Sequence, residues 1–154
     1  EPAKVMKHVQ WYADYFSSIT GIESGPEDLI IMSEGVYNFQ RIFNLRMGFG
    51  RREHDALPYR AVGPVTETEY ESRDERYDKQ LSEIYKFDID GKSTAEKLAT
   101  LRKHREEQYD TLKDAVYKRR GWTNDGIPTL KTARRLGIDF DDVVELLKAN
   151  GVNS

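Results

Sequence analysis

The chain has 154 residues, of which 38% are hydrophobic and 33% are charged, and this length and composition suit one domain with one core. Its formal net charge of -3 provides no general positive field for nucleic acid or for an anionic membrane. No apolar run approaches the roughly 18 residues that a membrane helix needs. We therefore expect a cytoplasmic protein with neither nucleic acid nor membrane as a partner.

Cysteine is absent from the sequence. The chain therefore supplies no disulfide, no thiolate nucleophile and no sulfur ligand for zinc or an iron–sulfur cluster. The chain also begins with Glu1 instead of methionine. We interpret it as a piece of a longer protein, a processed product or a trimmed chain.

The first predicted element is a helix over residues 2–19. Its apolar residues recur at steps of three and four, which is the helical period: Val5, Val9, Tyr12, Phe16 and Ile19. Thr20 and Gly21 end this helix. Its aromatic residues and those of the next helix are predicted to pack in the core and not to form a cofactor slot. They are Trp11, Tyr12, Tyr15, Phe16, Tyr37, Phe39 and Phe43.

A second helix is predicted over residues 26–47, with Pro26 in its first turn and Glu27 and Asp28 at its positive end. One apolar stripe comprises Leu29, Met32, Val36, Phe39, Phe43 and Met47, and a second side carries Ile31, Ile42 and Leu45. A surface helix needs only one stripe. The pattern predicts that several neighbours cover this helix, some of them supplied by other parts of a longer polypeptide.

Arg41 and Arg46 interrupt this largely apolar helix. A partly buried guanidinium needs an acid, a carbonyl oxygen or an anionic ligand. One hypothesis pairs the arginines with Glu34 or with an acid of another helix. The other places them against a phosphate or carboxylate that is bound at a domain junction.

The rest of the chain alternates between polar loops and further helices. Residues 48–60 form a basic loop, and residues 65–86 are predicted to be a solvated loop that leads into a short helix. Ser93 and Glu96 form a capping box that opens a helix to residue 119. Its inward stripe comprises Leu98, Leu101, Tyr109, Leu112 and Val116. A turn at residues 124–126 and helices over 129–136 and 141–149 follow, so the fold class is all-α, an irregular helical bundle.

No residue pattern in the chain indicates catalysis. The histidines His8, His54 and His104 lack the short spacing of a metal site, so we expect no metal ligands among them. No phosphate loop or serine elbow is present. The acidic residues Glu67, Glu69, Glu71, Asp74 and Glu75 are predicted to form a solvated face.

Two motifs resemble the C-terminal signature of the tungsten-containing aldehyde ferredoxin oxidoreductases. They are EGVYNFQRIFNLRMGFGRREHDALPYR and YKRRGWTNDGIPTLKTARRLGID. The positions that match the family pattern are Tyr37, Asn38, Arg41, Phe43, Asn44, Arg46, Gly48, Phe49, Leu57, Pro58, Arg60, Arg120, Gly121, Trp122, Gly126, Pro128, Leu136 and Gly137. The sequence departs from that pattern at Met47, at Thr123 and in a long charged insertion at about residues 66–107.

The resemblance implies the C-terminal helical domain of a larger enzyme. Such enzymes carry a tungsten or molybdenum bis-pterin and a [4Fe–4S] cluster, and they oxidise aldehydes to carboxylic acids with ferredoxin as electron acceptor. A related branch, the benzoyl-CoA reductase catalytic subunits, reduces aromatic acyl-CoA rings. The family's cluster cysteines belong upstream of the matched region, so the resemblance places no catalytic residue and no metal ligand in this segment.

The resemblance offers Arg41, Asn44 and Arg46 as candidate cofactor-binding residues. The expected partners are the upstream domains of the same protein, ferredoxin or another redox subunit, and a second copy in a homo-oligomer. A different hypothesis is a standalone helical interaction module, derived from such an enzyme, whose segment 66–107 binds a partner. These alternatives stay open at the level of the sequence.

Overall fold

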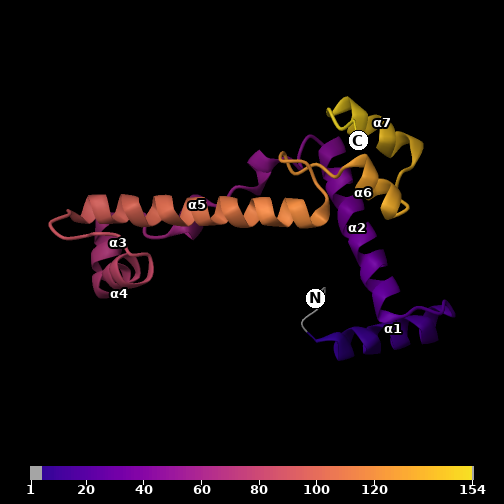
Figure 1. Cartoon of the computed structure of the whole chain (residues 1–154), viewed down its shortest axis with the longest axis horizontal. Coiled ribbons are helices and arrows are strands. Elements are labelled where there is room, and N and C mark those ends of the chain that lie inside the picture. Colours follow the sequence, from indigo (N-terminus) through magenta and orange to yellow (C-terminus); the bar gives the residue numbers. More distant parts are fainter. Residues whose placement is uncertain (1–4, 154) are drawn as a thin grey trace. The chain divides into compact units, whose positions relative to one another are not determined.

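A computed structural model describes residues 5–153, and its regular structure is helical (Figure 1). The α-helices of the described residues are α1 Met6–Thr20, α2 Pro26–Arg46, α3 Glu67–Glu71, α4 Asp74–Lys79, α5 Thr94–Arg120, α6 Leu130–Arg135 and α7 Asp141–Ala149. Those residues form no strand, and one isolated bridge joins Trp122 and Pro128. The all-α prediction is confirmed. No helix in this range is both long and apolar enough to cross a membrane.

The chain divides into two compact units. The first unit comprises the described parts of Glu1–His54 and Tyr117–Ser154, and the second comprises Asp55–Val116. The predicted insertion at residues 66–107 lies inside the second unit. The sequence predicted a single domain, and whether the two units unfold together stays a prediction.

The boundaries of α1 and α2 follow their end signals. Gly21 has φ 72° and its N–H donates to the carbonyl of Ser17, which ends α1. The Asp28 carboxylate accepts the N–H of Gly25 at 2.9 Å, which closes the start of α2. The predicted helix over residues 2–19 is confirmed from Met6, whereas residues 2–4 lie outside the described residues.

The core of the first unit forms around the second half of α2. Ile42 and Leu45 pack with α6, α7 and the segments beside them, through Ile127, Leu130, Ala133, Val143, Leu147 and Val152. The buried side of α2 also includes Gly35 and Asn38. Because positions 35, 38, 42 and 45 are spaced by three and four residues, they share one side of the helix.

Most of the remaining apolar positions of α1 and α2 are open to solvent, which corrects the predicted aromatic core. Six of its seven members are exposed, namely Trp11, Tyr12, Tyr15, Tyr37, Phe39 and Phe43, and Phe16 is half-buried. In α1, Ala13 is the buried residue. The reason is geometric, because packing on one side of a helix leaves its other sides uncovered.

The second unit has a core of its own. Tyr70, Tyr77, Leu81 and Leu101 are buried together, and Tyr85, Phe87, Ile89 and Leu98 pack against them. The prediction for residues 65–86 was a solvated loop that leads into a short helix. Short helices do form here, as α3 and α4, but the solvated loop is wrong because the segment contributes buried side chains to a core. Tyr70, Tyr77 and Leu81 are spaced by seven and four residues, which is a helical period hidden among charges. Glu67, Glu71, Asp74 and Glu75 are exposed as predicted, and Glu69 is half-buried.

Helix α5 begins at the predicted capping box. The N–H of Ser93 donates to Glu96 Oε2 at 2.8 Å, and the N–H of Glu96 donates to Ser93 Oγ at 3.3 Å. The predicted inward stripe is wrong at Leu112 and Val116, whose side chains are exposed. This helix is charged on most of its surface, and only short sections of it meet a core.

Candidate functional site

The motif residues of α2 and of the segment after α5 meet in a buried hydrogen-bond chain. Trp122 Nε1 donates to Asn38 Oδ1 at 2.6 Å, and Asn38 Nδ2 donates to the carbonyl of Glu34 at 2.9 Å. Asn38 is 0% exposed. The amide thus satisfies the indole N–H in an interior that offers it no water.

Guanidinium groups lie against the aromatic rings around this chain. Arg120 lies over Tyr37 at 4.0 Å and Arg41 over Trp122 at 4.9 Å. Tyr37 stacks on Trp122 with 6.0 Å between ring centroids. We call Tyr37, Asn38, Arg41, Arg120 and Trp122 the arginine–aromatic cluster. Cation–π contacts and the buried amide make it a rigid junction between α2 and the end of α5.

The cluster requires glycine at position 126. Gly126 has φ 77°, and a Cβ there would lie 2.5 Å from Arg41 Nη2 and 2.9 Å from the Tyr117 ring. Arg41 Nε donates to the carbonyl of Gly126 at 3.0 Å. Arg41, a candidate cofactor residue, is thereby engaged with the turn at residues 124–126.

The other two candidate cofactor residues lie near the end of α2. Arg46 Nη2 donates to Asp142 Oδ2 at 2.6 Å, and both side chains are largely exposed. This hydrogen bond lowers the pKa of the Asp142 carboxyl. The Asn44 carbonyl accepts the N–H of Phe49 at 2.8 Å and its side chain is exposed. Arg46 therefore pairs with an acid of another helix, and a cofactor contact at these positions stays a prediction.

Glu34, the other proposed partner of the α2 arginines, binds a different residue. Arg135 donates to its two carboxylate oxygens at 2.6 and 3.0 Å. This bidentate contact lowers the pKa of Glu34. The fork of a guanidinium matches the two oxygens of a carboxylate, which explains the choice of arginine at this position.

The basic loop after α2 is also held internally. Arg51 Nη1 donates to Asp125 at 2.5 Å and its Nη2 to Asn150 Oδ1 at 2.5 Å. The N–H of Arg52 donates to the carbonyl of Asp125 at 2.8 Å. Sequence reasoning missed these contacts, although the acid in the turn at residues 124–126 was the available signal.

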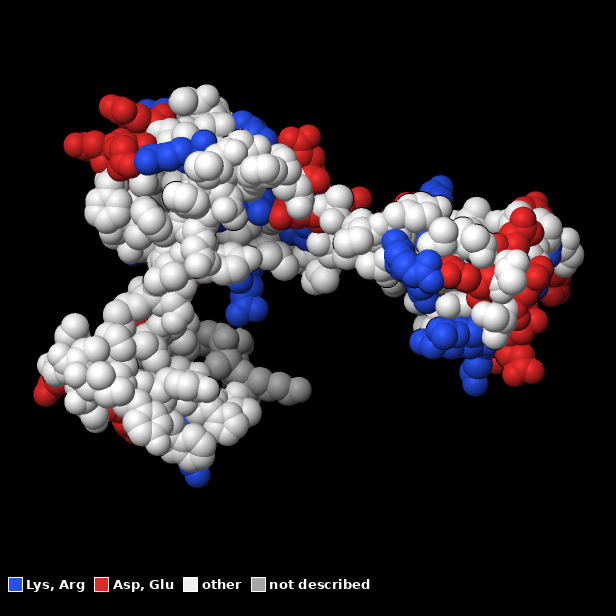
Figure 2. Space-filling view, turned by 180° about the vertical axis from the view of Figure 1, so that it is seen from behind, with Lys and Arg blue, Asp and Glu red and all other residues white. Residues whose placement is uncertain are grey.

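A large apolar surface remains open on α1 and α2. It comprises Trp11, Tyr12, Tyr15, Ile19, Ile22, Ile31, Met32, Val36, Phe39, Phe43 and Met47, which we call the apolar surface. Ile19 is 82% exposed and Val36 is 61% exposed. Figure 2 shows few charged side chains over the α1 part of the molecule. Large exposed apolar patches mark sites that contact proteins, membranes or ligands.

The histidines are dispersed among aromatic contacts. His8 stacks on Trp11, His54 contacts the edge of Phe49, and His104 lies 4.2 Å from the Tyr85 ring, centroid to centroid. Over the described range, no three histidine, cysteine or acidic side chains are grouped so that they could hold a metal ion.

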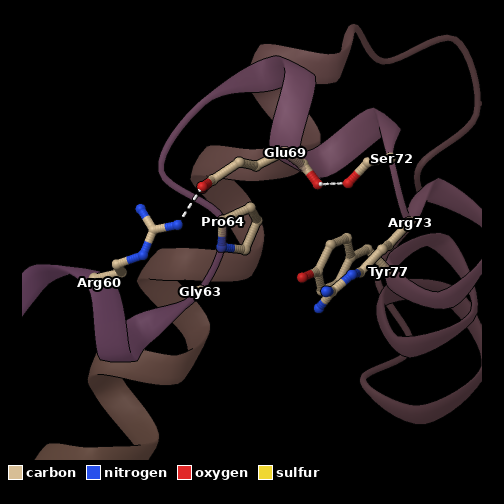
Figure 3. A pocket seen from close by; sticks show the side chains of 7 residues that line it. All are labelled: Arg60, Gly63, Pro64, Glu69, Ser72, Arg73 and Tyr77. Carbon is tan, nitrogen blue, oxygen red and sulfur yellow. Dashed lines mark hydrogen bonds and ion pairs between the residues drawn. The ribbon is translucent and has the colours of Figure 1, made fainter.

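The second unit contains an open pocket (Figure 3). It is lined by Arg60, Gly63, Pro64, Glu69, Ser72, Arg73 and Tyr77. Arg60 Nη2 donates to Glu69 Oε1 at 2.6 Å, and the N–H of Val65 donates to Glu69 Oε2 at 2.8 Å. These bonds, that of Val65 foremost, lower the pKa of Glu69.

Comparison with known families identifies the origin of these motifs. The model of "aldehyde ferredoxin oxidoreductase, domains 2 & 3" matches residues 2–138. The chain belongs to the aldehyde ferredoxin oxidoreductase family. The resemblance carried by the two motifs is thus confirmed, and the family is one of oxidoreductases. No curated protein and no solved structure matches the chain.

Membership of the aldehyde ferredoxin oxidoreductase family bears on both the fold and the cluster. The matched domains are the second and third of that family, so the chain corresponds to part of a larger multidomain protein. The match ends before α7, yet Val143 and Leu147 of α7 complete the first core. The arginine–aromatic cluster lies entirely within the matched residues.

Proposed function

We propose that this chain is the C-terminal helical part of a cytoplasmic enzyme that oxidises aldehydes to carboxylic acids and passes the electrons to ferredoxin. The family match over residues 2–138 carries the proposal. The motif residues also support the proposal, because they form a rigid junction between helices and do not form a set of reactive groups. In this proposal the segment contributes scaffold, and the chemistry belongs to other domains.

The apolar surface gives the segment its role in the assembled enzyme. Phe43 and Met47 are 56% and 60% exposed on a helix whose opposite side is already packed. Covering such side chains releases about 25 cal/mol for each Å² of apolar area removed from water. We propose that the upstream domains of the same polypeptide cover them and so complete the fold.

The described residues do not fit the cofactors that the family implies. Without cysteine the chain offers no thiolate to a [4Fe–4S] cluster, and its described residues contain no metal-binding group. Arg41 and Arg46 are bonded within the first unit. We therefore assign the tungsten or molybdenum pterin and the cluster to the remainder of the protein, and derive no catalytic step from this segment.

The full-length gene product provides the test of this function. Purified from a host supplied with tungstate and molybdate, it should contain tungsten or molybdenum together with iron, and should reduce a viologen dye when an aldehyde is added. The 154-residue chain alone should do neither. A folded full-length protein that binds no metal under these conditions would contradict the proposal.

A further inference from the structure

We propose that the pocket of the second unit binds a small oxyanion through Arg60, Arg73 and the hydroxyl of Tyr77. These residues are three of the seven that line this open pocket, whose volume is about 270 Å³. Figure 3 shows Arg73 and Tyr77 reaching from one side toward the space that Arg60 borders from the other. The proposal concerns a site outside the arginine–aromatic cluster and is independent of the proposed oxidoreductase function.

Tyr77 is the first feature that points to a ligand. The residue is 8% exposed and its ring packs on Tyr70 with 5.1 Å between centroids. Its hydroxyl forms no hydrogen bond with the residues that the structure describes, although the residue lines the pocket. The neighbouring Tyr70 hydroxyl donates to Asp78 at 2.7 Å. A phenol O–H held at a pocket wall is a ready donor to an anionic oxygen.

The two arginines supply the charge. Arg60 uses one nitrogen for Glu69, and a guanidinium has five N–H donors, so its other donors are free for a second oxygen. Arg73 precedes α4 and is exposed. Two guanidiniums against one carboxylate leave the lining with a net positive charge, and charge-assisted hydrogen bonds to oxyanions are among the stronger ones in proteins.

The Gly63–Pro64 side of the pocket is held in place by two arginines of α5, of which Arg102 is buried and Arg105 is half-buried. Arg102 is 6% exposed and donates to the carbonyls of Tyr59 and Pro64 at 2.8 and 3.0 Å. Arg105 donates to the carbonyl of Val62 at 3.0 Å, and a Cβ at Gly63 would lie 2.7 Å from its Nη1. A fixed wall keeps Arg60 near the pocket, which reduces the entropy lost when a ligand binds.

Phosphate and carboxylate groups share this chemistry, and titration separates them. Calorimetry of the 154-residue chain at low ionic strength should give saturable binding of pyrophosphate or of citrate. Tighter binding of pyrophosphate assigns a phosphate-bearing ligand, and tighter binding of citrate assigns a carboxylate. Heat changes without saturation for both probes would contradict the proposal.

Variants then locate the binding. Arg73→Ala should weaken it about tenfold, and Tyr77→Phe, which keeps the ring, should weaken it several-fold. Arg76→Ala removes the same charge from an exposed position of α4 outside the pocket lining, and should change the affinity less than twofold. Glu69→Gln should raise the affinity because it releases Arg60. Equal losses in the Arg73 and Arg76 variants, with circular dichroism unchanged, would overturn the assignment.

Discussion

Asn38 is the residue on which the packing of α2 depends most directly. It is fully buried and bonds both the Trp122 indole and the backbone of its own helix. Asn38→Ala should lower the free energy of unfolding by about 2 kcal/mol, because the indole N–H is left buried without an acceptor. Asn44→Ala on the same helix should change it by less than about 0.5 kcal/mol, since that side chain is exposed. Urea unfolding followed by tryptophan fluorescence measures both free energies. Similar values for the two variants would argue against the buried hydrogen bonds of Asn38.

We expect Asp78 to make the stability of the second unit depend on pH. Burial opposes its ionisation, but the hydrogen bonds from Lys97 and Tyr70 outweigh burial and lower its pKa. A carboxyl whose pKa is lower in the folded state stabilises the fold above its unfolded pKa, and this contribution disappears as the pH falls through the folded value. The stabilisation should therefore be complete at neutral pH and fade below about pH 4.

The variant Asp78→Asn tests whether this stabilisation is lost in acid. At neutral pH its free energy of unfolding, measured with urea, should be lower than that of the parent chain by about 1 kcal/mol, because the ion pair with Lys97 is lost. The gap from the parent chain should close as the pH falls below about 4. Glu75→Gln, at an exposed acid, should show no gap at either pH. A gap that widens in acid would be incompatible with a lowered pKa.

At the scale of the element, α2 joins a packed side to an open one. The packed side is held by Ile42 and Leu45, and the open side carries Val36, Phe43 and Met47. Exposed apolar side chains on this side would be removed from water if another domain packed against them. Under the proposed function, the open side of α2 is the surface that the upstream domains cover.

Phe43→Glu probes this side of the helix. In the 154-residue chain the substitution should change the free energy of unfolding by less than about 1 kcal/mol, because Phe43 is already 56% exposed. In the full-length protein it should lower the melting temperature and the metal content, since a charge then lies inside an interface. Leu112→Glu, at a residue 58% exposed on α5, serves as the matched control and should alter neither. Equal melting temperatures for both full-length variants would exclude the proposed cover.

At the scale of the whole molecule, the chain has two cores and a helix that contributes to both units. Leu101 of α5 lies in the second core, whereas Tyr117, also in α5, belongs to the first unit. Each core is small, so each unit depends on a few side chains. The division raises the question of whether the units unfold in one step or in two.

Leu81→Ala addresses that question, because Leu81 is 0% exposed in the second core. The cavity should cost about 2–4 kcal/mol, and hydrogen exchange should accelerate in residues 55–116 while α6 and α7 keep their protection. Leu147→Ala, in the first core, should give the reverse pattern. Uniform acceleration across the chain in both variants would mean that the units form one cooperative domain.

The sequence alone determined the features that depend on neighbouring residues. The capping box at Ser93 and Glu96, the proline start of α2, the end of α1 at Gly21 and the two family motifs all act over a few positions, so their spacing was sufficient. The predicted core was wrong at Trp11 and Leu112, which are exposed, because the sequence did not show which side of each helix would be covered.

Tertiary structure decided which partner each side chain has. Arg46 could bond any acid within reach, and only the placement of α7 brings Asp142 to it instead of Glu34. Tyr70 and Tyr77 lie among charged residues in the sequence, yet they are buried because Leu101 of α5 packs in the same core. Periodicity tells which residues share a side of a helix, but the element that covers this side comes from distant parts of the chain, whose position no local pattern encodes.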